Sequence, residues 1–117
     1  MTRFVLTVVA FFLSANAFAQ EYDGKWTAMN PAGKPITLTL EQTGPGGVSG
    51  KLEGNGHVFD VEAEIRADGI QGLVMREDAL VHLTGRIHER MLWIVLREPG
   101  PDGLPDDQTR RIIRFTR

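Results

Sequence analysis

The sequence predicts an all-β protein: a single antiparallel up-and-down meander of about eight strands that forms a closed or nearly closed β-barrel. Apolar and polar residues alternate along most of the chain after residue 20, and no stretch shows a 3.6-residue apolar period. Short turn motifs separate the alternating stretches, so consecutive strands must pair with each other. Closure into a barrel removes exposed sheet edges. An open or two-layer β-sandwich is the alternative architecture for the same strands.

The first nineteen residues have the pattern of a secretory signal peptide. Arg3 is the only charged residue in the first twenty, an apolar run covers residues 4–13, and Ala17-Phe18-Ala19 forms a small-residue cleavage site. The apolar run is too short to span a bilayer comfortably. We therefore expect a signal peptide at 1–19, a β-barrel domain at 20–117, and a periplasmic or extracellular protein that is not inserted in a membrane.

Composition excludes several classes of function. Residues 20–117 carry 12 basic and 15 acidic residues, a net charge of −3, which argues against nucleic acid and anionic membrane surfaces as partners. The chain has no cysteine, so disulfides, thiol catalysis, zinc–thiolate sites and a lipid anchor on cysteine are not expected.

The first four strands are predicted from alternation and from the turns between them. In the second strand, large aliphatic residues alternate with threonine and glutamate, and in the fourth, apolar residues alternate with Asp60, Glu62 and Glu64. The Gly-Asn-Gly turn before the fourth strand supplies the positive φ that a tight hairpin needs. The expected ranges are 22–29, 35–43, 48–53 and 57–66.

The last four strands follow in the same way. The sixth alternates apolar residues with polar ones that include His82 and His88. The seventh is apolar on both faces around Trp93, which indicates that one face meets the core and the other is covered, as in a homodimer. The expected ranges are 70–76, 80–88, 91–98 and 109–116. Glycines inside the strand patterns (Gly24, Gly50, Gly72 and Gly85) are expected where strands of a small coiled barrel bend.

We expect no catalytic residue, no metal site and no cofactor, and hence no enzyme. Ser49 is the single serine after residue 20, and it lies in no G-x-S-x-G motif. His82 and His88 are six residues apart on one strand, about 20 Å, so they cannot share a metal. His57 opens an earlier strand.

Three carboxylates, Asp60, Glu62 and Glu64, form a row on one strand. A pair of them could serve a glycosidase only across a cleft. We interpret the row as an exterior face whose cross-strand partners are arginines: Arg66, Arg76 and Arg86.

The longest irregular segment covers residues 99–108. It contains three prolines and three aspartates, and it could serve as a lid, a partner-binding loop, a weak calcium site or a stiff connector. The candidate partner-binding residues are Asp102, Leu104, Asp106 and Asp107.

Gly24-Lys25-Trp26-Thr27 resembles the Gly-x-Trp start of the calycin superfamily, the lipocalins and avidins. The segments 93–97 and 113–117 resemble the seventh and last strands of avidin. The resemblance implies a barrel in which Trp26 closes one end and an arginine of a late strand, Arg97 or Arg114, stacks against it. Ala28 stands where avidins have an asparagine that binds biotin, so the resemblance implies the barrel without biotin binding.

These observations predict a binding protein for a small apolar or mixed ligand, held in the barrel mouth by Trp26, Phe59 and Trp93. Its cavity would be lined by residues such as Ile36, Leu38, Val61 and Leu83. The alternative is a protein–protein interaction module, such as an inhibitor or an envelope accessory protein, with a filled barrel. That module would use residues 99–108 or an exposed patch at Leu92, Ile94 and Leu96.

Overall fold

The structure, a computed structural model, describes residues 21–117, so the expected signal peptide lies outside the described residues. The described part is all-β, as predicted, with one short 3-10 helix, η1 (Asp107–Thr109). None of its helices is long and apolar enough to cross a membrane. The strands are β1 (Gly24–Met29), β2 (Pro35–Gln42), β3 (Gly47–Gly54), β4 (His57–Arg66), β5 (Gly69–Arg76), β6 (Ala79–His88), β7 (Met91–Arg97) and β8 (Arg111–Phe115).

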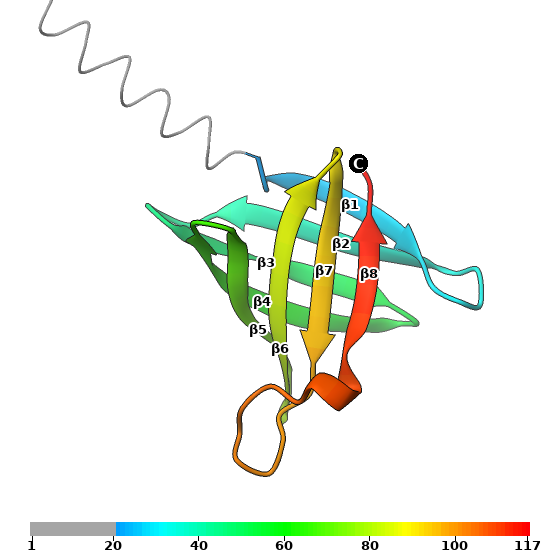
Figure 1. Ribbon diagram of the computed structural model, residues 1–117. Coiled ribbons are helices and arrows are strands. Elements are labelled where there is room, and N and C mark those ends of the chain that lie inside the picture. The colour runs from blue at the N-terminus through cyan, green and yellow to red at the C-terminus, as the bar shows by residue number, and fades with distance from the viewer. Residues whose placement is uncertain (1–20) are drawn as a thin grey trace, which may run out of the picture.

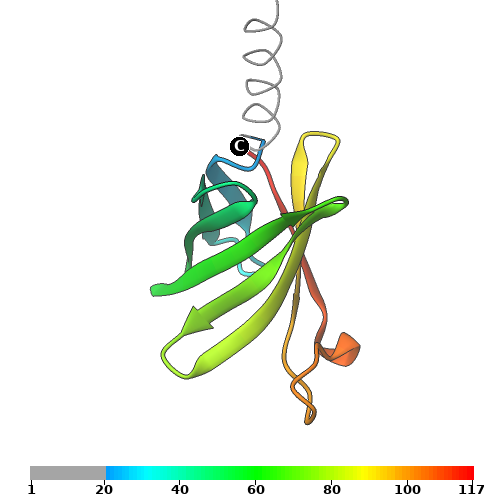
Figure 2. The same cartoon turned by 90° about the vertical axis from the view of Figure 1, so that its left-hand side faces the viewer.

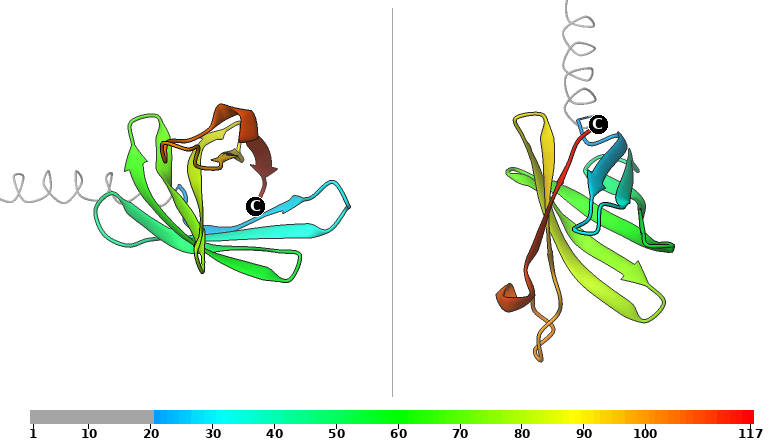
Figure 3. Two further views of the ribbon diagram at one scale, coloured as in Figure 1. Left: turned by 90° about the horizontal axis from the view of Figure 1, so that it is seen from below. Right: turned by 90° about the vertical axis from the view of Figure 1, so that its right-hand side faces the viewer.

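Each strand pairs antiparallel with the next, in the order β1 to β8, which confirms the predicted meander. The sheet coils so strongly that β2–β4 run across β6–β8 (Figures 1 and 2). β1 and β8 then meet at a seam, where Thr27 and Thr116 exchange two backbone hydrogen bonds of 2.7 and 2.8 Å. The result is a nearly closed barrel, which Figure 3 shows from below.

The predicted strand ranges agree with the observed ones to within two residues, and β4 agrees at both ends. The largest difference is at β8, which begins at Arg111 because the preceding residues form η1. The Asp106 side chain accepts a hydrogen bond from the Gln108 amide, and the Thr109 hydroxyl accepts one from the Glu98 amide, so this segment turns before it pairs.

The core fills the end of the barrel interior at which Trp26 lies. Alternate residues of every strand point inward, and the rows contributed by the eight strands meet around Trp26 and Phe115, both completely buried. The other buried apolar residues are Tyr22, Leu38, Leu40, Val48, Val61, Ala63, Ile70, Val74, Leu83, Leu92 and Ile94.

Two glycines permit neighbouring strands to approach closely. A Cβ at Gly50 would lie 1.8 Å from the Thr39 carbonyl oxygen, and one at Gly72 would lie 2.0 Å from the Glu62 carbonyl oxygen. Both glycines therefore serve the tight coiling of the sheet, in agreement with the interpretation from sequence.

Candidate functional site

The barrel has one closed end, built around Trp26. Its indole nitrogen donates a 3.0 Å hydrogen bond to the Tyr22 carbonyl oxygen. The guanidinium of Arg117 lies 4.2 Å from the Trp26 ring centroid and donates a 2.8 Å hydrogen bond to the Asp23 carbonyl oxygen. The expectation that Arg97 or Arg114 would stack on Trp26 is wrong: Arg97 pairs with Asp107 and Arg114 lies over Trp93.

The opposite end of the barrel is open, and inward-facing residues form a cavity there of about 210 Å³. Its walls are apolar side chains from strands on both sides of the barrel: Leu52, Phe59, Val74, Val81 and Leu96. The packed core forms the floor of the cavity. Val74 is almost completely buried, and the core residues between Val74 and Trp26 fill the rest of the interior. Because its lining residues continue the inward rows of β3–β7, this mouth cavity lies inside the barrel.

Charged and polar side chains stand at the entrance of the mouth cavity. Arg76 is the last residue of β5, Arg111 is the first of β8, Glu98 directly follows β7, and Thr109 of η1 adds a hydroxyl. The Arg76 guanidinium lies 5.8 Å from the Phe59 ring centroid, a cation–π distance. The entrance thus has two cationic groups and one carboxylate above an apolar interior.

The expected ligand residues lie in three different places. Phe59 lines the mouth cavity, Trp26 is completely buried at the closed end, and Trp93 is on the outer face of β7. Of the expected lining, Leu38, Val61 and Leu83 belong to the filled core. The residues that line the cavity lie further toward the open end. They could have been predicted from the sequence only by following the inward-facing residues of each strand to the end of that strand.

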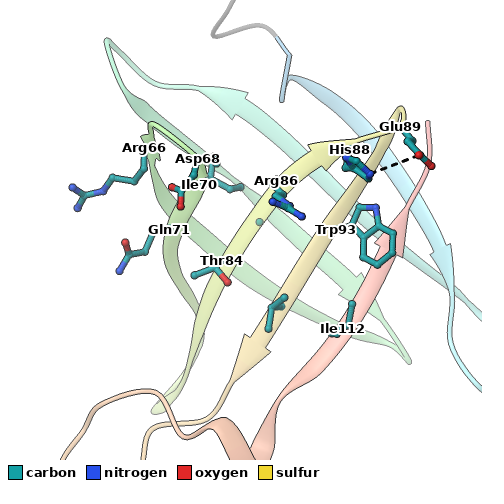
Figure 4. Close-up of a pocket in the computed structure, with 13 residues that line it drawn as sticks. Arg66, Asp68, Ile70, Gln71, Thr84, Arg86, His88, Glu89, Trp93 and Ile112 are labelled. Carbon is teal, nitrogen blue, oxygen red and sulfur yellow. Dashed lines mark ion pairs between the residues drawn. The ribbon is translucent and has the colours of Figure 1, made fainter.

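The outer face of β5–β8 holds a second, larger hollow of about 650 Å³, the Trp93 groove (Figure 4). Apolar side chains of β7 and β8 (Trp93, Val95 and Ile112) line it together with polar ones (Arg66, Asp68, Gln71, Thr84, Arg86, His88 and Glu89), and the core residue Ile70 borders it. This groove was not predicted from the sequence. Its signal was the apolar outer face of the seventh strand, which was interpreted as a subunit contact.

The expected exposed patch at Leu92, Ile94 and Leu96 is wrong for this strand. Leu92 and Ile94 are buried in the core and Leu96 lines the mouth, so the outward residues are Trp93 and its neighbours of the same parity. Because both faces of β7 are apolar, alternation alone could not decide which face points inward.

Residues 99–108 form a braced loop beside the mouth, visible at the bottom of Figure 1. Pro99 and Pro105 form an isolated β-bridge, and Arg97 Nε donates a 2.7 Å hydrogen bond to Asp107. The His82 ring nitrogen lies 3.1 Å from the Gly103 carbonyl oxygen, which ties the loop tip to β6. Leu104 stays 63% exposed. The carboxylate of Asp102 accepts a hydrogen bond from the Leu104 amide, so it supports the turn.

The carboxylate row of β4 lies on the outside of the barrel, as expected. Of the expected arginine partners, Arg66 pairs with Glu64 at 2.8 Å, from the same strand, whereas Asp60 pairs with Lys51 of β3. The expected partner Arg76 points into the mouth instead. Within residues 21–117, no group of three or more acidic or histidine side chains is placed to hold a metal ion.

Two titratable groups in the described residues have shifted pKa values. Burial raises the pKa of the Tyr22 hydroxyl above its usual value, and the negative charges of Glu21 and Asp68 raise it further. The hydrogen bond and attraction to Asp60 raise the pKa of the exposed Lys51 amine. Neither group lies in the mouth cavity or in the Trp93 groove.

Comparisons with protein-family models, with curated proteins and with solved structures found no match to this chain. The geometry of the two hollows and of the braced loop is therefore the basis for functional inference.

Proposed function

We propose that this chain is an exported, calycin-like binding protein that holds the apolar part of a small molecule in its mouth cavity. The observation that carries the proposal is a hollow of about 210 Å³ inside an otherwise filled barrel, with apolar walls and a charged entrance. Export is inferred from the signal-like residues 1–19, and the calycin likeness from Trp26 closing one end under an arginine.

The size and lining of the mouth cavity define the class of ligand. A dry apolar cavity of about 150 Å³ holds benzene, so a cavity of about 210 Å³ accommodates one small aromatic ring or a short branched chain. Burial of that group supplies the affinity, and the polar end of the ligand stays at the entrance. There Arg76 and Arg111 favour a ligand whose exposed end carries a negative charge or hydrogen-bond acceptors.

Native mass spectrometry of the mature protein, isolated from its natural compartment, tests the proposal first. A stoichiometric adduct is expected, and its mass would limit the identity of the ligand. Toluene, followed through the methyl NMR signals of Val74 and Leu52, provides a defined probe of the same cavity.

A filled cavity separates mouth binding from adventitious binding. Val81→Phe places a ring in the mouth and should abolish both the adduct and the toluene shifts. Val58→Phe is the matched control, because Val58 is 51% exposed on the outer face of β4. A bare protein that also ignores toluene, or equal binding by both variants, would contradict the proposal.

A second candidate function is supported by the braced loop. Its bridge, its ion pair and the tie to His82 fix the loop before any partner arrives, which lowers the entropic cost of binding, while Leu104 remains exposed at its surface. These features suit a protein–protein interaction module.

Site-specific photo-crosslinking tests this second function. A photoreactive residue at position 104 should give one discrete protein adduct in the natural compartment, identified by mass spectrometry. The same residue at Leu80, which is 37% exposed on β6, serves as the control. Asp107→Ala removes the brace to Arg97 and should reduce the adduct. Equal adducts from positions 104 and 80 would count against the loop.

A further inference from the structure

The outer surface of the barrel is divided by charge. The outward positions of β6–β8 carry three arginines, Arg86, Arg97 and Arg114, and no carboxylate. Arg97 is paired with Asp107, whereas Arg86 and Arg114 form no ion pair with any side chain that the structure describes. The outward positions of β2–β4 carry five carboxylates: Glu41, Glu53, Asp60, Glu62 and Glu64.

Trp93 stands between the two unpaired arginines. In the sheet register it lies opposite Arg86 of β6 on one side and Arg114 of β8 on the other. The Arg114 guanidinium lies 5.0 Å from the Trp93 ring centroid. Arg86 and Trp93 both line the Trp93 groove, whose volume of about 650 Å³ is within the range of small-molecule sites.

The indole N–H of Trp93 has no hydrogen-bond partner among residues 21–117, although the atom itself is covered. Figure 4 shows the nitrogen on the side of the ring that faces His88. A covered donor without an acceptor is unfavourable, and an acceptor group in the groove would satisfy it once the side chains that cover the nitrogen move aside.

We propose that the Trp93 groove is a second binding site, for a small anionic molecule with a planar apolar body. The anion (a carboxylate, sulfonate or phosphate) lies between Arg86, which lines the groove, and Arg114, which lies over Trp93 outside the lining, and the apolar body packs on Trp93, Val95 and Ile112. Ile112 is 52% exposed, so this surface is accessible.

Charge also decides against two other occupants of the groove. A symmetric second copy would place Arg86 and Arg114 against the same arginines of its partner, which is repulsive. A cationic ligand would meet the same two charges. The carboxylates of the lining are Asp68 and Glu89, both in turns, and Glu89 lies 3.7 Å from His88.

The anionic fluorophore 1-anilinonaphthalene-8-sulfonate tests the site on the mature chain at low ionic strength. We expect binding of one probe, with energy transfer from tryptophan that is strongest from Trp93, because Trp93 lines the groove. Combining Arg86→Gln with Arg114→Gln should weaken the affinity at least about tenfold. Arg86→Lys should retain most of it, and added salt should weaken it.

Three controls keep the test decisive. Lys34→Gln removes the same charge from the exposed β1–β2 turn and should leave the affinity unchanged. Val81→Phe blocks the mouth cavity and should also leave it unchanged, so failure of the mouth proposal does not affect this one. If circular dichroism shows that the double variant is unfolded, the affinity of the probe is measured for Trp93→Phe and for the single Arg86→Gln variant instead. Both variants should bind the probe more weakly than the wild type.

Two results would overturn the proposal. Unchanged affinity in the arginine variants would place the probe elsewhere. Sedimentation of the wild-type chain as a dimer that Arg86→Glu dissociates would show that a second copy covers the groove.

Discussion

The closed end of the barrel depends on four residues that act together. Trp26 is completely buried, yet its indole nitrogen is satisfied by the Tyr22 carbonyl, and the Arg117 guanidinium covers the ring from outside. Arg117 also donates to the carbonyl of Asp23, whose side chain accepts from the Gln42 amide. The last residue of the chain therefore holds the start of β1 against the end of β2.

Arg117→Gln should reduce the free energy of unfolding by about 1 kcal/mol, because it removes a cation–π contact and a hydrogen bond at an exposed position. Urea denaturation measures the change. Arg110→Gln, which removes an exposed arginine just after η1, should have little effect. Equal losses in the two variants would show that net charge, and not the contact with Trp26, is responsible.

Tyr22 should make the protein sensitive to alkali. Its pKa is raised in the folded state, chiefly by burial, so the unfolded chain loses the tyrosine proton first, near the ordinary value of 10.0. The stability that the protonated Tyr22 hydroxyl contributes to the folded state is complete below pH 10.0, and it is lost as the pH rises through the folded-state pKa. Tyr22 is the only tyrosine, so its ultraviolet absorbance reports this ionisation directly.

The matched variant is Tyr22→Phe, which keeps the ring and the backbone carbonyl that Trp26 uses. Its stability should fall less between neutral and strongly alkaline pH than that of the wild type. An identical alkaline loss in both proteins would assign the effect to other groups.

At the scale of the strand, alternation and turn chemistry were sufficient to predict eight strands and their order. Inward and outward faces were predicted wherever one face is polar, as in β4, where Val61 is buried between charged neighbours. The prediction of the inward face failed for β7, because this strand is apolar on both faces, and so Trp93 was expected in the mouth. The partner of Trp26 was also missed, because the β1–β8 register depends on closure of the whole sheet and not on any local pattern.

Gly72→Ala should destabilise the protein by more than about 2 kcal/mol, since its Cβ would lie 2.0 Å from the Glu62 carbonyl oxygen and two strands must separate. Gly54→Ala is the control: its Cβ would meet Ile36 at an ordinary 3.5 Å. Thermal unfolding of both variants measures the difference. A Gly72→Ala protein as stable as the control would mean that β4 and β5 can separate at no cost.

At the scale of the molecule, the barrel is a row of hairpins closed by one weak seam. Each of the seven other strand pairs is joined along several residues, whereas β1 and β8 share the single bridge of Thr27 with Thr116. The mouth cavity follows from this geometry, because the core residues fill the closed end and the coiled strands diverge toward the open one. Its volume depends on the tilt and coiling of all eight strands, which no local pattern of residues specifies.

The seam should open before the rest of the barrel. Native-state hydrogen exchange is expected to show less protection at the Thr27 and Thr116 amides than at amides of β4, which is paired on both sides. The exchange of the seam amides should also depend less on added denaturant. Equal protection and equal denaturant dependence would mean that the barrel opens only as a whole.

The closed end has a practical consequence for handling the protein. Tyr22 and Arg117 both lie there, on the opposite side of the barrel from Phe59 and the mouth cavity. Attachment of the protein to a solid support through either of these two residues therefore leaves the mouth facing the solution. Sensors immobilised through position 22 or through position 117 should present the same cavity to an analyte.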